Sequence, residues 1–387
     1  MKTSAASPKD IVPFNKPPLL GGELDAIRQC LGEGAFSGNG RFSRQCARLL
    51  EDRLPVARAL ITPSCTAALE MAAILCDLGP GDEAIVPSFT FSSTANAIAL
   101  RGAVPVFVDI EPDTLNLSPD AVEQAITGRT RAIFVVHYAG VPCEMDRINE
   151  IAAAHGLVVI EDAAQALGST YRGRAAGALA SMAAFSFHAT KNIVSGEGGA
   201  LTLGDPALVE RAEIVQEKGT NRSQFVRGEV DKYTWVDIGS SYLLSEIAAA
   251  FLIGQVRSVD EINAGRLATW QAYRDSFLDL EKSGRVRLPF VPEHVHHNAH
   301  IFYLLLRDEA ERDRFLEAMR GQGVMATSHY VPLHSSPAGR KYGRGAGSLA
   351  QTDRTADTIV RLPLYFGMSD RDRDRVIDRV RAYFSAE

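Results

Sequence analysis

Short apolar segments alternate with helical patterns over the first two hundred residues. Seven of them are typical of buried strands: residues 59–61, 84–86, 104–108, 132–136, 157–160, 183–187 and 200–203. Between the first two segments, Leu69, Ala72, Ala73 and Cys76 recur at the spacing of one helix face, which predicts a helix over residues 66–77. Strands that alternate with helices indicate an α/β fold, with a seven-stranded, mainly parallel sheet flanked by helices.

The pattern changes after residue 203. A helix is expected near residues 206–216, and the polar stretch 217–235 is too long for an ordinary connection, so it is either a functional loop or an extended arm. A helical pattern from about residue 243 to 280 then leads to a strand at 299–306 and to helices at 309–321 and 370–384. We therefore predict a large cofactor-binding domain over residues 1–255 and a small α+β C-terminal domain over residues 256–387.

Composition narrows the class of protein. The chain has 387 residues, of which 46% are hydrophobic, and a formal net charge of −6, which argues against general binding to nucleic acid. Residues 1–10 lack the apolar core of a secretory leader, and no apolar run is long enough to span a membrane. The five cysteines form no Cys-x-x-Cys pair, which favours reduced thiols. These features predict a soluble, cytoplasmic protein with no membrane partner.

Lys191 and Asp162 are the candidate catalytic residues. Lys191 follows the alternating strand 183–187 and precedes the glycine-rich turn 195–199, where its amine could form a Schiff base. An isolated lysine is more often a surface residue, and Asp162 alone could be a helix cap. However, Asp162 stands two residues after the apolar run 157–160, and ligands of parallel sheets bind at the carboxyl ends of strands. An amine together with a carboxylate that keeps a pyridine nitrogen protonated predicts a site for pyridoxal 5'-phosphate.

Three further segments offer groups that this cofactor needs. Residues 62–68 place hydroxyl side chains at a helix start, where backbone N–H groups could bind the phosphate, although an ordinary helix cap is equally consistent. Ser186 is a second phosphate candidate, or a solvent-facing serine on the strand. Either Phe89 or Phe91 could stack on the cofactor ring, although core packing is the more common role of phenylalanine.

Two other clusters are ambiguous. The histidines at positions 294, 296, 297 and 300 lie in a pattern that favours the entry to a strand over a metal site, so no metal is expected. The basic stretch contains Lys218, Arg222, Arg227 and Lys232, with aromatic residues between them. It is either a solvated loop or a clamp for a diphosphate and an aromatic base.

The motifs at 161–165, 185–192 and 196–199 resemble those of the DegT/DnrJ type of pyridoxal-phosphate sugar aminotransferases, and the resemblance covers nearly the whole chain. It implies an aspartate-aminotransferase-like fold in which Lys191 forms the Schiff base and Asp162 pairs with the pyridinium nitrogen. The other cofactor contacts that it implies are Gln165 at the ring hydroxyl, Phe91 on the ring face, and Thr66, Ala67 and Ser186 at the phosphate.

The resemblance also suggests a substrate. The segments 218–225 and 231–235 are similar to those of family members that transfer the amino group of L-glutamate to C4 of dTDP-4-dehydro-6-deoxy-D-glucose, giving dTDP-4-amino-4,6-dideoxy-D-galactose for surface polysaccharide synthesis. The substrate contacts implied are Arg222, Lys232, Tyr233 and His329. Another nucleotide-linked 3-keto or 4-keto sugar, on a UDP or GDP carrier, is an alternative, and a non-catalytic binding protein on the same fold is a third hypothesis.

The same resemblance implies a homodimer with active sites shared between subunits. Many members place an asparagine from the neighbouring subunit on the cofactor phosphate, whereas this chain has Leu243 at the matching position. Ser240 or Ser241 could replace that contact.

Overall fold

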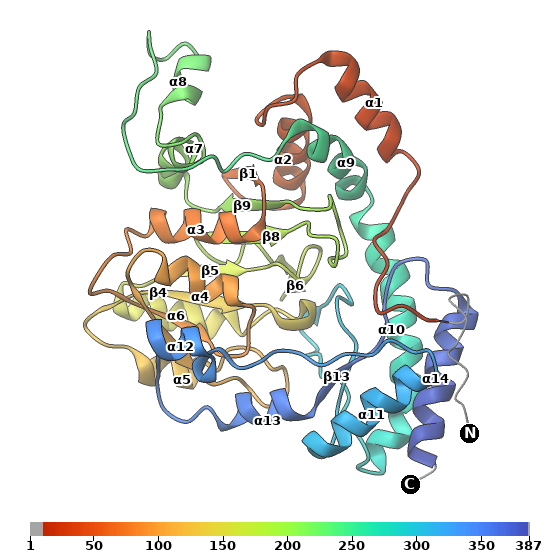
Figure 1. Ribbon diagram of the computed structural model, residues 1–387. Coiled ribbons are helices and arrows are strands. Elements are labelled where there is room, and N and C mark those ends of the chain that lie inside the picture. The colour runs from red at the N-terminus through yellow and green to blue at the C-terminus, as the bar shows by residue number, and fades with distance from the viewer. Residues whose placement is uncertain (1–10, 386–387) are drawn as a thin grey trace.

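A computed structural model describes residues 11–385, and its centre is a mainly parallel sheet (Figure 1). All seven predicted strands are present: β1 (Arg58–Thr62), β2 (Glu83–Pro87), β3 (Val104–Val108), β4 (Thr130–Val136), β5 (Val158–Asp162), β8 (Met182–Ser186) and β9 (Gly199–Leu203). The sheet order is β1-β9-β8-β5-β4-β2-β3-β12. Among the seven predicted strands, only β9 runs antiparallel to both of its neighbours, β1 and β8. The α/β class is therefore confirmed.

Helices cover both faces of this sheet. Neighbouring residues of a strand point to opposite faces, so Ile85 packs into one hydrophobic core and Val86 into the other. The first core lies against α2 (Arg41–Arg53), α6 (Met145–His155) and α9 (Glu246–Arg257), and the second lies against α3 (Cys65–Leu75) and α7 (Val209–Gln216). The remaining helices of this part are α1 (Glu23–Glu33), α4 (Ser92–Ala99) and α5 (Pro119–Ala125).

The C-terminal part has a third core of its own. It is built by α10 (Val259–Lys282), α11 (Glu309–Gly321) and α14 (Asp370–Ser385) around the two-stranded sheet of β11 (Tyr303–Leu305) and β13 (Ile359–Arg361). Val12 also packs into this core, which ties the N-terminal segment to it. The predicted domain boundary after residue 255 falls within α9, and the division into residues 1–255 and 256–387 stays a prediction.

Three sequence expectations need correction. The sheet has eight strands, because the two-residue strand β12 (Arg344–Gly345) from the C-terminal part joins its edge beside β3. The helical pattern 243–280 is two helices, α9 and α10, which are separated at Ser258. The strand expected at 299–306 is limited to β11, because Ala299 has a positive φ of 52° and the carbonyl groups of residues 299–301 accept hydrogen bonds from the side chains of Arg266 and Trp270.

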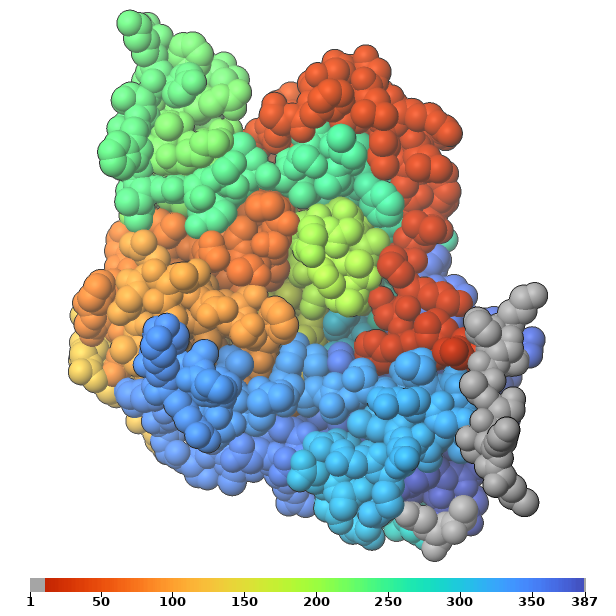
Figure 2. Space-filling model, in the orientation of Figure 1, coloured from red at the N-terminus to blue at the C-terminus, as the bar shows by residue number. Residues whose placement is uncertain are grey.

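The polar stretch after α7 is an arm that stands out from the body of the molecule (Figure 2). It contains the short helix α8 (Arg222–Val226), and it returns to the body through pairing of Thr220 with Trp235 and of Glu217 with Ser241. The smaller elements of the chain are β6 (Thr170–Tyr171), β7 (Arg174–Ala175), β10 (Val295–His296), α12 (Pro337–Tyr342) and α13 (Ala350–Thr358). No helix in residues 11–385 is both long and apolar enough to cross a membrane.

Candidate active site

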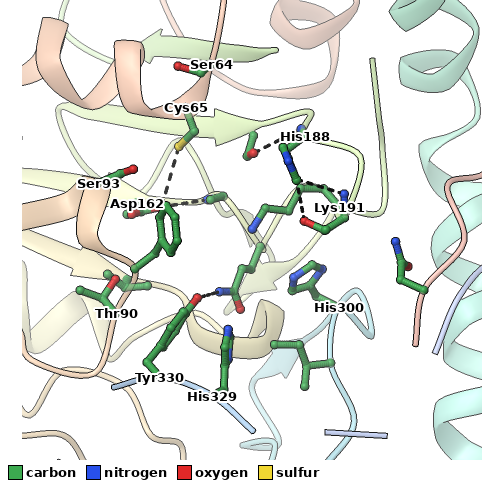
Figure 3. Close-up of a pocket in the computed structure, with 18 of the residues that line it drawn as sticks. Ser64, Cys65, Thr90, Ser93, Asp162, His188, Lys191, His300, His329 and Tyr330 are labelled. Atoms are coloured by element: carbon green, nitrogen blue, oxygen red, sulfur yellow. Dashed lines mark hydrogen bonds between the residues drawn. The ribbon is translucent and has the colours of Figure 1, made fainter. Parts of the chain in front are cut away.

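Asp162 and Lys191 line one cavity of about 680 Å³ at the carboxyl edge of the sheet (Figure 3). Asp162 is the last residue of β5, and Lys191 follows the parallel neighbour β8 in a turn closed by a 2.9 Å hydrogen bond from the Lys191 backbone N–H to the carbonyl of His188. Because β5 and β8 run in the same direction, their carboxyl ends meet. The topology thus brings together the two residues that the sequence analysis paired.

The Asp162 carboxylate is buried, with 6% of its surface exposed. It accepts hydrogen bonds from Thr94 Oγ1 at 2.8 Å and from the Ala164 backbone N–H at 3.2 Å. Burial raises its pKa above the usual value, while these two donors and the charge of Lys191 act in the opposite direction. A buried carboxylate of this kind gains stability from a cationic partner inside the cavity.

The Lys191 amine points into the same cavity and is half-buried. Burial lowers the pKa of this amine below that of an ordinary lysine, although the nearby Asp162 favours the charged form. A lowered pKa increases the fraction of neutral amine at physiological pH. The neutral amine is the form that attacks an aldehyde.

The phosphate candidates surround the start of α3. Ser64 caps the helix by accepting a 3.1 Å hydrogen bond from the Ala67 backbone N–H, and Thr66 Oγ1 lies 2.7 Å from Ser93 Oγ. Ser64, Thr66 and Ser186 line the cavity, whereas Ala67 is not among its lining residues. The helix N-terminus offers partial positive charge and N–H groups, which together suit a phosphate.

Glycine lets β9 approach this helix start closely. A Cβ at Gly199 would lie 2.4 Å from the Ser64 carbonyl carbon, so any larger residue would displace the turn that precedes α3. This explains in part the glycines of the 196–199 run. The role of Gly199 is close packing at the end of the sheet, whereas Gly196 has a positive φ of 83° and a Cβ there would meet no atom within 4 Å.

The two phenylalanines have different surroundings. Phe89 is 1% exposed and packs against Tyr138 with ring centroids 5.1 Å apart. Phe91 is 60% exposed and lines the cavity. An aromatic ring that is left exposed at the cavity is available to stack on a bound ligand, so the structure supports the choice of Phe91 and places Phe89 in the core.

Gln165 and His329 are held by partners on the cavity wall. Gln165 accepts a 2.8 Å hydrogen bond from the Ala139 backbone N–H and donates at 3.1 Å to the Tyr330 hydroxyl. His329 Nδ1 lies 3.1 Å from the Tyr138 hydroxyl, and its ring stacks on Tyr330 with centroids 3.4 Å apart. Burial and the charge of Arg361 keep the pKa of His329 well below its usual value, so the imidazole is neutral near pH 7.

The other predicted substrate residues lie on the arm and do not line this cavity. Arg222 is exposed and donates at 3.0 Å to the buried carboxylate of Glu217. Lys232 and Tyr233 are exposed, and the Tyr233 ring packs on Phe225 with centroids 5.6 Å apart. Within one chain, the arm and the Lys191 cavity are therefore separate.

The residues proposed to replace the missing asparagine also lie outside the cavity lining. Leu243 is half-buried, and Ser240 and Ser241 are exposed. Whether one of these serines takes over the phosphate contact stays a prediction.

The histidine cluster is dispersed. His294 Nε2 lies 3.0 Å from Glu144, His297 packs against Trp270, and His300 Nδ1 lies 2.9 Å from Asn192 Oδ1. In residues 11–385 no group of three or more His, Cys, Asp or Glu side chains is arranged to hold a metal ion.

Several cavity residues from the C-terminal part were not assigned to this site by the sequence analysis. Arg266 comes from α10, His300 from the segment before β11, Tyr330 from the segment after α11, and Arg361 from the end of β13. None of them stands in a local motif. Only their shared place in the folded C-terminal part connects them with Lys191.

These residues fit pyridoxal phosphate. The cavity combines an amine of lowered pKa, a buried carboxylate that forms no ion pair with any residue between 11 and 385, a helix start and an exposed aromatic ring. Lys191 would hold the aldehyde, and Asp162 would hold the ring nitrogen. The ring face would lie on Phe91, and the phosphate would lie at the start of α3. The fold and the site thus define a pyridoxal-phosphate-dependent enzyme.

The chain belongs to the DegT/DnrJ/EryC1/StrS aminotransferase family, whose model matches residues 21–381. Among curated proteins, it is 34% identical to the spore coat polysaccharide biosynthesis protein SpsC of Bacillus subtilis, over 96% of both chains. Among solved structures, it is similar to the aminotransferase TlmJ from Streptoalloteichus hindustanus, at 32% identity and a TM-score of 0.88 over 97% of this chain and 99% of that one. DesV from S. venezuelae is 33% identical, with a TM-score of 0.87 over 96% and 98% of the two chains.

These comparisons confirm the expected fold, the expected cofactor and the expected enzyme class. The protein is a pyridoxal-phosphate-dependent aminotransferase of a sugar aminotransferase family. A Streptococcus pneumoniae relative, a sugar aminotransferase named Spr1654, is 26% identical in its pyridoxal-phosphate form, with a TM-score of 0.88 over 97% of this chain and 99% of that one.

Proposed function

We propose that the protein transfers the amino group of L-glutamate to C4 of dTDP-4-dehydro-6-deoxy-D-glucose, giving dTDP-4-amino-4,6-dideoxy-D-galactose and 2-oxoglutarate. The aminotransferase activity is supported by the placement of Lys191 and Asp162 at the ends of adjacent parallel strands, where both line one cavity. The choice of substrate rests on the arm, whose segments 218–225 and 231–235 resemble those of enzymes with this substrate.

Lys191 and Asp162 have the central roles in this reaction. Pyridoxal phosphate, when bound, accepts the amino group and withdraws electrons from the reacting carbon. Lys191 Nζ would hold the aldehyde group of the cofactor, and its free amine would take the proton from the donor Cα. Asp162 holds the proton on the ring nitrogen, and Thr94 holds Asp162 in place. In the second half of the reaction, Lys191 moves the proton in the reverse direction at the sugar carbon.

The arm fits a role on a neighbouring subunit. It carries exposed Arg222 and Lys232 beside the Phe225–Tyr233 ring pair, a combination that can hold a diphosphate and an aromatic base. Because the arm lies apart from the Lys191 cavity of its own chain, we infer a homodimer in which it reaches the partner's site. A cytoplasmic location belongs to the same proposal and is supported by the five cysteines, all of which are free.

The test is an amino-transfer assay with the purified holoenzyme, L-glutamate and dTDP-4-dehydro-6-deoxy-D-glucose, with the product identified by NMR. We expect an axial amine at C4. An equatorial amine would contradict the galacto assignment, and faster turnover of a UDP- or GDP-linked keto sugar would favour another carrier. Sedimentation tests whether the protein is a dimer. The shared site is tested by mixing Lys191→Ala and Arg222→Ala chains, which should restore part of the activity that each variant lacks alone.

A further inference from the structure

Gln165 carries one N–H group that has no acceptor within the protein. Its side chain is 5% exposed and lines the active-site cavity. The side-chain oxygen accepts a 2.8 Å hydrogen bond from the Ala139 backbone N–H, which fixes which end of the amide is oxygen and which is nitrogen. Nε2 donates one of its two hydrogens to the Tyr330 hydroxyl at 3.1 Å. Among residues 11–385, no acceptor is bonded to the second hydrogen, so a ligand in the cavity can accept it.

Tyr330 is a rigid anchor for this amide. Its ring stacks on His329 with centroids 3.4 Å apart, and it meets the ring of Phe89 edge-on at 5.5 Å. Burial raises the pKa of Tyr330 above its usual value, so the hydroxyl keeps its proton and accepts the Gln165 N–H through its oxygen. The Gln165 amide is therefore held at both ends, by the Ala139 backbone and by a hydroxyl of fixed position.

The anchors of the cofactor determine which ring substituent this wall would meet. In pyridoxal phosphate, the ring nitrogen lies opposite the carbon that bears the aldehyde, and the phosphate arm and the C3 hydroxyl flank that carbon on its two sides. With the nitrogen at Asp162, the aldehyde at Lys191 and the phosphate at the start of α3, the C3 oxygen would face away from α3. Figure 3 shows Ser64, which caps α3, on one side of Lys191, and Tyr330 on the other. The C3 oxygen would thus face the wall that Gln165 and Tyr330 line.

We propose that Tyr330 is a positioning residue for the cofactor ring: by holding one hydrogen of Gln165 Nε2, it directs the other toward the C3 oxygen. A donor at this oxygen disperses its negative charge, so the oxygen attracts the proton of the neighbouring Schiff-base nitrogen less strongly. The pKa of that nitrogen is lowered as a result. The inference concerns the cofactor alone, and it depends on neither the amino donor nor the keto sugar of the proposed function.

The first test is a pH titration of the visible absorbance of the holoenzyme, without substrate. Tyr330→Phe keeps the stacked ring and removes only the hydroxyl. We expect the pKa of the Schiff-base nitrogen to rise by about 0.5 to 1 unit, as for the weakening of one hydrogen bond. Tyr273→Phe is the matched control, because it removes a buried tyrosine hydroxyl that donates at 2.8 Å to the Pro363 carbonyl outside the cavity lining. It should titrate like the wild type.

Two further measurements ask whether Tyr330 acts through Gln165. In a Gln165→Met background, which has no N–H to direct, Tyr330→Phe should cause no further rise in the pKa. In the apoenzyme, Tyr330→Phe should weaken binding of pyridoxal phosphate by about 2- to 10-fold. It should leave unchanged the affinity for 3-deoxypyridoxal 5'-phosphate, which lacks the C3 hydroxyl.

Three results would overturn the proposal. The first is a wild-type pKa in Tyr330→Phe. The second is an equal rise in the Gln165→Met background, which would mean that Tyr330 bonds to the ring directly. The third is an equal loss of affinity for both cofactors, which would reduce Tyr330 to a packing role. If Gln165→Met does not load, the comparison of the two cofactors decides by itself.

The readout is specific to the C3 side of the ring. The other charged or titratable side chains of the cavity stay the same in every variant, among them Asp162, His300, His329 and Arg361. Retained visible absorbance shows that each variant is folded and loaded. Because no substrate is added, an error in the proposed donor or keto sugar would leave these results unchanged.

Discussion

Thr94 Oγ1 donates a 2.8 Å hydrogen bond to Oδ2 of Asp162, a residue that lines the active-site cavity. Thr94 is fully buried on α4, and its hydroxyl also lies 3.0 Å from that of Thr90. The Asp162 carboxylate is thereby fixed in orientation by a helix that follows a different strand. The hydroxyl favours the ionised form of the carboxylate, against the effect of burial.

We expect Thr94→Val to weaken binding of pyridoxal phosphate by about tenfold, because loss of a hydrogen bond to a buried charged group costs about 1.5 kcal/mol. The Asp162 carboxylate would then hold the ring nitrogen in a less defined position and with a higher pKa. Titration of the apoenzyme with the cofactor measures the affinity. Thr94→Ser keeps the hydroxyl and is expected to bind like the wild type; equal affinity of Thr94→Val and Thr94→Ser would show that this hydrogen bond has no role.

The lowered pKa of Lys191 predicts how Schiff-base formation depends on pH. The fraction of reactive neutral amine increases as pH rises through the pKa, so the rate of reconstitution with pyridoxal phosphate should rise and level off below the ordinary lysine value of 10.5. Stopped-flow absorbance over a series of pH values measures this profile. Lys191→Ala should bind the cofactor without the Schiff-base absorbance and should lose transamination, and a variant that still turned over would contradict the role given to Lys191.

Phe91 and Phe89 should respond differently to truncation. Phe91 is 60% exposed, so Phe91→Ala should leave the free energy of unfolding almost unchanged while weakening cofactor binding through loss of the stacked ring. Phe89 is 1% exposed, and Phe89→Ala should lower the free energy of unfolding by about 3–4 kcal/mol, as for other cavities created in a core. Urea denaturation of the apoenzymes and cofactor titration separate the two effects. The assignment of Phe91 fails if its truncation destabilises the fold as much as that of Phe89.

The central pair of the site could be predicted from sequence because both residues follow strands. Asp162 and Lys191 each come after an apolar run, and parallel order brings the ends of such runs together. Arg361 and Arg266 could not be predicted in this way, since they come from the C-terminal part and reach the cavity only through its packing. Neither arginine forms an ion pair with an acidic residue within residues 11–385, and the sequence does not reveal this.

The fold was predictable to a similar extent. Each of the seven longer strands contains a short apolar segment, and all of them form. The strand β12 has only two residues, Arg344 and Gly345, and no hydrophobic pattern. It joins the sheet beside β3 because the Arg344 side chain donates hydrogen bonds to the buried carboxylate of Glu83, which lies on the adjacent strand β2. Such a tertiary ion pair leaves no periodic signal in the sequence.

The ion pair at Glu83 predicts acid sensitivity of this sheet edge. Glu83 is 1% exposed and accepts hydrogen bonds from Arg344 at 3.1 and 2.8 Å and from Thr127 at 2.8 Å. Arg344 contributes most to lowering the pKa of Glu83, from 4.5 to about 2. A carboxylate whose pKa is lower in the folded state stabilises the fold above pH 4.5, and this contribution is lost as the pH falls from there toward about 2.

We therefore expect Glu83→Gln to lower the free energy of unfolding by about 1–2 kcal/mol near neutral pH, a value that allows for solvent screening of Arg344 and of Arg129, which also pairs with Glu83. The difference from the wild type should shrink steadily below pH 4.5, because the wild-type carboxylate becomes protonated. Urea denaturation at a series of pH values measures both quantities. Glu123→Gln removes a half-exposed carboxylate that pairs with Arg147, and it should have little effect at any pH. A Glu83→Gln effect that stays constant down to about pH 3 would mean that the loss comes from packing and not from the charge of Glu83.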